Sequence, residues 1–333
     1  MLLHSFETND ALRLRNARPP LTLPSMTPSA AQRRPRLGLC SQFVRAPIRF
    51  LTTTAAALGR LPRRRQLERL AKICAANADA LLEALRYCVA HDIGSFRILS
   101  PILPLKTHPK VGYRIEDLPG VDAIVAAFRR SGAFARDHDI RTGFHPDPFV
   151  VLNSPETDIV RRAVADIESQ AEIAEWVNAD TINIHGGGAY GDRPAALGRF
   201  VRNVERLSER ARARLTVEND DRVFTPADLL PVCRAAELPL VYDAHHHRCL
   251  PDGMSVEEAT AAAVTTWNRE PLFHLSSPIA GWRGPDPRRH HDYIDPRDFP
   301  AAWRNRPITV ELEAKAKELA VERLRRALAR ERP

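Results

Sequence analysis

The chain has 333 residues, of which 44% are hydrophobic and 27% charged, as in a folded globular protein with one large domain. No run of about 18 apolar residues occurs, which argues against a transmembrane helix. Five scattered cysteines without a C-x-x-C pair argue against a disulfide framework or a zinc ribbon and fit a reducing compartment. The formal net charge is +8, but residues 1–36 contribute half of it through six arginines against Glu7 and Asp10, so basicity alone is a weak indicator of nucleic-acid binding.

In chain order, residues 1–35 come first; they are rich in Pro, Ser, Thr and Arg, lack hydrophobic periodicity and are expected to form a disordered extension. From Arg36 onward, short β-prone runs alternate with longer helical patterns. Strands are expected at residues 37–40, 96–99, 141–145, 181–185, 215–218, 240–243, 272–276 and 308–313. Helices are expected at roughly 64–90, 121–137, 157–178, 194–213, 226–236, 255–268, 296–304 and 314–330.

Helix-start residues support several of these assignments. Thr225 followed by Pro226 is an N-cap with proline at the first helical position, and Ser255 precedes two glutamates in a first turn. Eight β-then-α units over about 300 residues predict a single (β/α)8 TIM barrel spanning residues 36–330. A doubly wound open sheet is the alternative, but it would not place ionisable residues at the end of nearly every strand.

Two insertions follow strands and would therefore lie on the active face of a barrel. Residues 42–63, after the first strand, carry Arg45 and Arg49. Residues 277–295, after the seventh strand, carry Arg283 and Arg288. Arginine suits bidentate phosphate contacts, although a GC-rich coding bias would produce the same abundance of arginine.

The expected strand ends share one feature, because six of them supply histidine or a carboxylate. These residues are His145, His185, Glu218, Asp243 with His246 three positions later, His274 and Glu313. In a barrel they converge on one rim, where packed carboxylates and imidazoles are unfavourable unless cations lie between them. A set of His and carboxylate ligands without thiolate suits Mn, Zn or Fe rather than Ca, and Glu218 could bridge two ions. Taken singly, each histidine could instead be a hydrogen-bonded structural residue and each carboxylate an ion-pair partner of arginine.

Several of these residues lie in segments that resemble the UV damage endonuclease family. The segments are NIHGGGAYGD (183–192), LTVENDDRVFTPADLLPVC (215–233), LVYDAHHH (240–247), FHLSS (273–277), HHDYI (290–294) and ELEAKAKELAV (311–321). The resemblance extends from about residue 36 to 328. It implies a barrel related to endonuclease IV and xylose isomerase, with two or three divalent metals, usually Mn, with Zn, Mg or Co as alternatives.

The resemblance also implies hydrolysis of the phosphodiester 5′ to a UV photoproduct or other helix-distorting lesion, in double-stranded DNA. The implied metal ligands are His145, His185, Glu218, Asp243, His246, His274, His290 and Glu313. His108, Glu218 and Lys315 are the expected catalytic residues, and Phe149 with Arg45, Arg49, Arg283 and Arg288 the expected DNA contacts. A monomer acting in the bacterial cytoplasm, at the nucleoid, is expected.

The sequence departs from the usual family pattern at three positions. Pro148 stands where a lesion-probing glutamine is usual, Leu272 where a metal-site lysine is frequent, and Leu39 where the first strand usually has tyrosine. Metal-dependent phosphodiester chemistry is therefore better supported than photoproduct specificity. A metal-dependent sugar isomerase or epimerase, and a damage-binding relative that does not cleave, are the alternatives.

Overall fold

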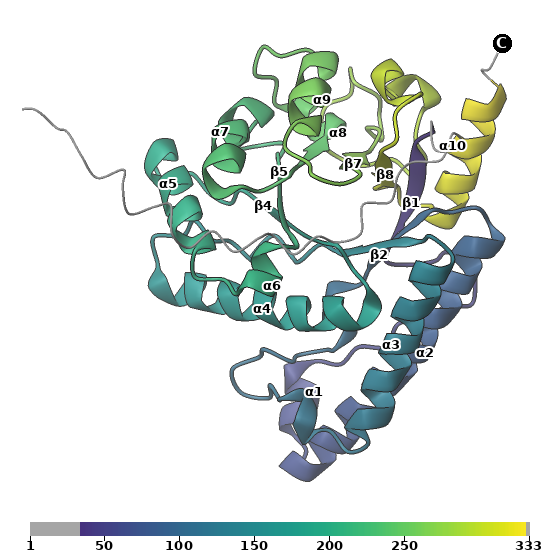
Figure 1. Ribbon diagram of the computed structural model, residues 1–333, viewed down its shortest axis with the longest axis vertical. Helices are drawn as coiled ribbons and strands as arrows, with labels where there is room; N and C mark the ends of the chain where they lie inside the picture. The colour runs from purple at the N-terminus through teal and green to yellow at the C-terminus, as the bar shows by residue number, and fades with distance from the viewer. Residues whose placement is uncertain (1–33, 331–333) are drawn as a thin grey trace, which may run out of the picture. The chain divides into compact units, whose positions relative to one another are not determined.

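Eight short strands form the centre of the fold in the computed structural model, which describes residues 34–330. They are β1 (Arg36–Cys40), β2 (Ser95–Ile98), β3 (Arg141–Phe144), β4 (Thr181–His185), β5 (Leu215–Glu218), β6 (Leu240–Asp243), β7 (Leu272–Leu275) and β8 (Thr309–Leu312). Neighbouring strands are parallel, and β1 pairs with both β2 and β8, so the sheet closes (Figure 1). The closure confirms the TIM barrel and excludes an open sheet. The expected extension lies, except for its last two residues, outside the described range.

Helices surround this barrel (Figure 1). The longer ones are α2 (Arg63–Ala90), α3 (Val121–Asp137), α4 (Thr157–Val177), α5 (Arg193–Val204), α7 (Pro226–Ala236), α9 (Val256–Val264) and α10 (Glu318–Arg330). The short ones are α1 (Ala55–Gly59), α6 (Glu209–Arg212), α8 (Ala244–Cys249) and the 3-10 turns η2 (Ser100–Ile102), η3 (Ile115–Asp117), η4 (Pro296–Asp298) and η5 (Ala301–Trp303). Among residues 34–330, no helix is both long and apolar enough to cross a bilayer.

Three expected helices differ from those observed, each for a local reason. The helix expected at 194–213 is two helices, because Ser208 caps a new one through its side chain, which accepts from Ala211 N. The helix expected at 296–304 is two 3-10 turns, because Phe299 precedes Pro300 and is held in an extended conformation. The helix expected from residue 314 begins at Glu318, because Lys317 adopts a left-handed conformation with φ 50°.

Polar side chains from β2 and β8 fill one part of the barrel interior. Ser95 and Arg97 on β2 both contact Glu311 on β8, across β1, so these three side chains point into the barrel. Gly38 on β1 makes room for them, because a Cβ at this position would lie 2.8 Å from Cγ of Glu311. The alternate residues of β2, such as Phe96, are buried on the outer, helix-facing side.

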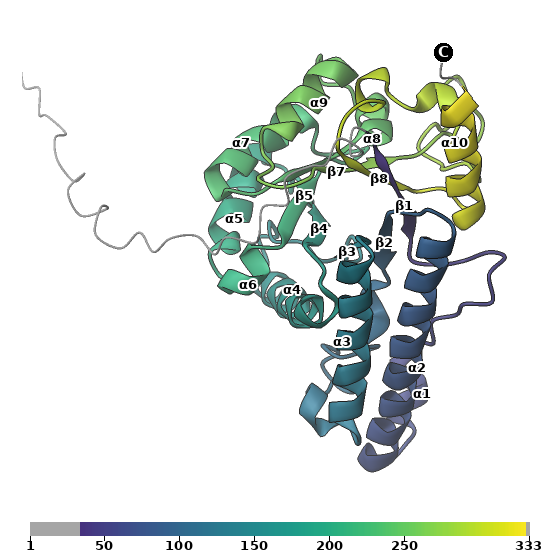
Figure 2. The same ribbon diagram turned by 45° about the vertical axis from the view of Figure 1, so that its right-hand side comes forward.

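One part of the molecule extends past the strand ends. The 28-residue helix α2 is about 42 Å long. The C-terminal end of this helix leads into the start of β2, so the N-terminal half of the helix lies beyond the rim formed by the carboxyl ends of the strands. Together with α1, the loop at 103–120 and the start of α3, this half forms an extension that is prominent in Figure 2. We call residues 55–72 and 103–124 the overhang.

Candidate metal centre

The residues at the carboxyl ends of the strands meet at one rim of the barrel. His185 and Glu218 are register partners on β4 and β5, and Asp243 and His274 are register partners on β6 and β7. Such partners lie at the same height of the barrel, and their side chains point to its interior. The sequence pattern of one ionisable residue per strand end therefore becomes a compact cluster.

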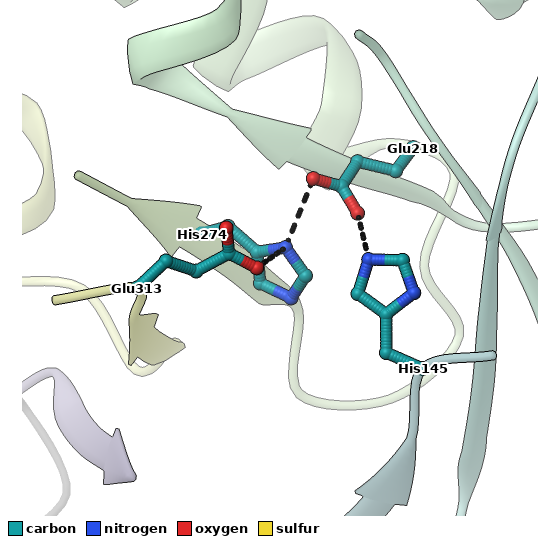
Figure 3. A group of neighbouring side chains, drawn as sticks. All are labelled: His145, Glu218, His274 and Glu313. Carbon is teal, nitrogen blue, oxygen red and sulfur yellow. Dashed lines mark ion pairs between the residues drawn. The ribbon is translucent and has the colours of Figure 1, made fainter. Parts of the chain in front are cut away.

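Glu218 is the centre of this cluster and is fully buried. Its Oε2 lies 3.0 Å from Nε2 of His145, and its Oε1 lies 3.0 Å from Nδ1 of His274. Glu313 approaches the same histidine from β8, with Oε1 3.6 Å from Nδ1 of His274 (Figure 3). Figure 3 shows these four side chains, from β5, β7 and the residues after β3 and β8, directed at one another.

Three overlapping groups have ligand atoms within 4.8 Å of one another. They are His145 with Glu218, His274 and Glu313; Glu218 with Asp243 and His246; and His246 with His290 and Glu313. Seven of the eight expected ligands are therefore grouped. The eighth, His185, lies beside them, with its ring centroid 5.0 Å from that of His145 and 6.0 Å from that of His246.

His246 owes its place to a short helix that the sequence did not predict. Asp243 caps α8 by accepting from His246 N at 2.7 Å, which turns the chain back over the rim. Nδ1 of His246 lies 3.0 Å from the carbonyl oxygen of Asn219. Nδ1 also lies 3.4 Å from Glu218 Oε1 and 3.6 Å from Asp243 Oδ2, so this ring nitrogen faces the two carboxylates of the cluster.

Unpartnered atoms in the cluster fit a set of cations. Among the described residues, five buried atoms of the expected ligands have no hydrogen-bond partner: His145 Nδ1, His185 Nδ1, Glu218 Oε1, Asp243 Oδ2 and His274 Nδ1. Glu218 Oε1 and His274 Nδ1 are 3.0 Å apart, but their geometry is not that of a hydrogen bond. Each buried polar atom without a partner costs about 1–3 kcal/mol, so five in one cluster call for another group between them. Divalent cations bind nitrogen and oxygen ligands of this kind.

The ionisation states follow from burial and mutual proximity. Burial opposes charge on Glu218, yet His274, His185 and His145 hold its pKa well below the usual value. Burial alone would lower the pKa of His274, but Glu218 raises it to about 9. His246 behaves in the same way, because Asp243 and Glu218 outweigh its burial and raise its pKa well above the usual value. Without metal the cluster therefore binds protons in the places that cations would occupy.

Arg97 is a member of the site that sequence reasoning missed. This buried guanidinium donates to Glu311 Oε2 and Glu313 Oε1, each at 2.6 Å, and lies 2.7 Å from Nε2 of His274. It thus contacts two expected ligands, Glu313 and His274. It also neutralises Glu311, whose Oε2 lies 3.4 Å from Nε2 of the same histidine. The available sequence clue was an arginine in the middle of an otherwise apolar strand run.

Asn183 is a second residue that was missed. Its Nδ2 donates to Glu218 Oε2 at 2.5 Å, while its Oδ1 accepts from Thr216 at 3.1 Å. The amide therefore fixes the orientation of the central carboxylate from the adjacent strand. Asparagine two residues before His185 shares its inward face, which is the sequence clue that could have identified it.

The other expected catalytic residues lie outside the three ligand groups. His108 is in the overhang, where its Nδ1 accepts from the backbone N–H groups of Lys110 and Val111 at 3.2 and 3.3 Å. Lys315 is exposed, and its backbone N–H donates to the carbonyl of His291 at 3.2 Å. Leu39 and Leu272 are buried apolar residues of the barrel.

A pocket of about 760 Å³ opens beside the ligand cluster. His185 and His246 line it, together with Phe149, Tyr190 and Arg222. Phe149 is 83% exposed, and Tyr190 is 47% exposed with the Arg199 guanidinium 5.7 Å from its ring centroid, so Phe149 offers the more accessible ring at the pocket. A planar apolar group that enters beside the ligands would have rings available for stacking.

The expected DNA-contacting arginines Arg45, Arg49, Arg283 and Arg288 are all exposed. The loop that carries Arg45 is fixed by the buried carboxylate of Glu318, which accepts from the N–H groups of Val44, Arg45 and Ala46 at 2.9, 2.6 and 3.1 Å. Arg49 donates to carbonyl groups of this same loop, and Arg288 pairs with Asp286 at 3.2 Å.

Comparisons with known proteins agree with this geometry. The family model of UV-endonuclease UvdE matches residues 35–332. The UV DNA damage endonuclease of Bacillus cereus (strain G9842) is 32% identical over 284 residues, which cover 82% of this chain and 87% of that protein. The crystal structure of SacUVDE is similar with a TM-score of 0.79 and 26% identity, covering 89% of this chain and 98% of that one.

Endonuclease IV from Thermus thermophilus shares the fold, with a TM-score of 0.58 and 17% identity over 90% of this chain and all of that one. The expected barrel type and enzyme class, an endonuclease, are thereby confirmed. The chain belongs to the UV-endonuclease UvdE family.

Proposed function

We propose that this protein is a metal-dependent DNA repair endonuclease that hydrolyses the phosphodiester 5′ to a UV photoproduct or other helix-distorting lesion. One observation carries the proposal: the cluster of histidines and carboxylates around the buried Glu218, with five unpartnered ligand atoms, in a chain of the UvdE family. The donor set suits two or three divalent ions, Mn first, with Zn, Mg or Co as alternatives.

Glu218 would hold two of the ions, because it belongs to two of the ligand groups, as Glu313 also does. Bound divalent ions supply Lewis acidity, which lowers the pKa of water and neutralises charge on a phosphate. The protein fixes the ligands for this purpose. Asn183 orients Glu218, and Arg97 holds Glu313 while balancing the charge of Glu311.

Double-stranded DNA is the proposed substrate, bound by a monomer in the cytoplasm, at the nucleoid. The exposed arginines of the two insertions would contact backbone phosphates, which gives affinity but no lesion specificity. Phe149, free at the mouth of the pocket, would stack on a base at the lesion. Because Pro148 has no amide side chain, we expect recognition to depend on stacking and duplex distortion rather than on hydrogen bonds to one photoproduct.

The test is incision of an end-labelled duplex with one cyclobutane dimer, in Mn2+, beside abasic and undamaged duplexes. The informative variant is Glu218→Gln, which keeps the shape but removes the shared charge; exposed Glu237→Gln is the matched control. We expect a nick 5′ to the dimer from the wild type and the control, and none from Glu218→Gln. No nick at any lesion by folded protein with Mn2+ bound would refute the proposal and favour sugar substrates or damage binding.

A further inference from the structure

A second pocket lies in the overhang, away from the expected metal ligands. It has a volume of about 460 Å³, and its lining includes Arg63, Lys106, His108, Lys110, Arg114 and Asp117. None of the eight expected metal ligands lines it. The overhang extends past the carboxyl ends of the strands (Figure 2). This basic pocket is lined by overhang residues, so it is on the same side of the barrel as the metal centre.

Specific contacts fix the walls of the basic pocket. Arg63, at the start of α2, donates to the carbonyl of Gly112 at 2.9 Å and so joins the helix to the loop. Tyr113 is buried, and its hydroxyl lies 3.4 Å from Sγ of Cys74 on α2. At Gly112 a Cβ would lie 2.4 Å from the carbonyl oxygen of His108, so the tight turn requires glycine. The pocket is therefore formed before any ligand binds.

Positive charge dominates the basic pocket. Four cationic side chains and one histidine face a single lining carboxylate, Asp117. Lys110 has no ion pair with any residue from 34 to 330, and Arg114 is 81% exposed despite its 3.3 Å contact with Glu116. Over residues 60–72 and 106–117, nine Lys and Arg stand against three Asp and Glu. Such a concentration of charge attracts a polyanion.

The basic pocket neighbours the larger pocket. Thr107 in its wall donates to the Asp166 carboxylate on α4. Asp166 lines the larger pocket, together with His185 and His246 of the metal cluster. A hydrogen-bonded pair of side chains therefore joins the walls of the two pockets. Lys106 fixes the same loop to α4 through Glu172, at 2.7 Å.

We propose that the basic pocket binds a backbone phosphate of the DNA duplex other than the phosphate that is cleaved. The proposal rests on the proposed function, and it adds a phosphate site outside the three groups of expected metal ligands. Lysine and arginine side chains around a preformed pocket give binding to phosphate that is independent of base sequence. The pocket would determine the length of duplex beside a lesion that the enzyme needs for full affinity.

The test measures binding to undamaged duplex DNA in Mn2+, at several salt concentrations, with duplexes shortened stepwise from either end. The variant is Lys110→Glu with Arg114→Glu, both exposed, and Lys110→Gln with Arg114→Gln is the milder version. Arg212→Glu, also exposed, is the control, because α6 directly precedes β5 and lies at the opposite end of the barrel. Incision of a dimer duplex at saturating protein is measured in parallel.

We expect the double Glu variant to bind at least about tenfold more weakly and the slope of log K against log salt to fall by about 1, because the pocket would hold one phosphate and each phosphate contributes about 0.9. The wild type should lose affinity when one end of the duplex is shortened, whereas the double variant should not. If the double variant binds like Arg212→Glu, the basic pocket is not a phosphate site, even if dimers are incised. If binding changes as expected but no lesion is incised, the basic pocket stands and the proposed function fails. A wild type that binds no duplex at low salt overturns both.

Discussion

Arg97 gives the sharpest stability prediction. Arg97 is 8% exposed, and its guanidinium makes 2.6 Å contacts with Glu311 and Glu313, of which Glu311 is nearly completely buried. Substitution Arg97→Met keeps the apolar stem and removes the charge, so it leaves a buried carboxylate without its partner. Breaking a buried pair in this way costs about 3–5 kcal/mol. In a domain of about 300 residues, with an unfolding entropy of about 2.1 cal/mol/K per residue, that corresponds to a fall in Tm of about 5–8 °C.

The second half of the test is the double variant Arg97→Met with Glu311→Leu. Removing both partners leaves no uncompensated charge at this position, so most of the lost stability should return. Thermal melts would be recorded with and without Mn2+ after removal of metal, with exposed Arg212→Met as the control. Mn2+ should raise the Tm of Arg97→Met, because Glu313 is an expected ligand. A loss below about 1 kcal/mol in Arg97→Met, or a double variant as unstable as the single one, would refute this account.

Three further predictions follow from the same contacts. In metal-free protein, burial would lower the pKa of His274, but Glu218 raises it from 6.5 to about 9. Protonated His274 should therefore contribute stability that is complete below pH 6.5 and is lost as the pH rises through 9. The Tm measured against pH should show this loss, and Mn2+ should abolish it. Burial would raise the pKa of Glu311, but Arg97 lowers it from 4.5 to about 2. Ionised Glu311 should therefore contribute stability above pH 4.5 that is lost toward pH 2. A metal-free Tm that does not change across this interval would contradict the pairing. Glu318→Ala should free the loop that carries Arg45 and cost about 2–4 kcal/mol, seen as faster tryptic cleavage at that arginine; cleavage at the wild-type rate would show that the carboxylate does not fix the loop.

The site could largely be predicted from the sequence, because a TIM barrel converts a linear pattern into convergence. One ionisable residue at the end of each β-prone run is enough to expect a cluster, and the structure brings seven of the eight expected ligands into groups. His108 was expected from the resemblance and Lys315 from its place just after Glu313, and both lie outside these groups. Only local backbone effects moved the helix boundaries, such as Pro300 and the left-handed Lys317.

The sequence by itself determined the number and order of the β/α units, the candidate ligands and the family. The tertiary structure alone decided which groups hold those ligands in place. Arg97 and Glu311 are 214 residues apart and meet only when β1 lies between their strands and the barrel closes. The basic pocket likewise forms only because α2 is longer than the barrel and carries Arg63 to a loop about 50 residues away. Periodicity and motifs report local preferences, whereas these contacts depend on distances between distant segments, which only the folded chain sets.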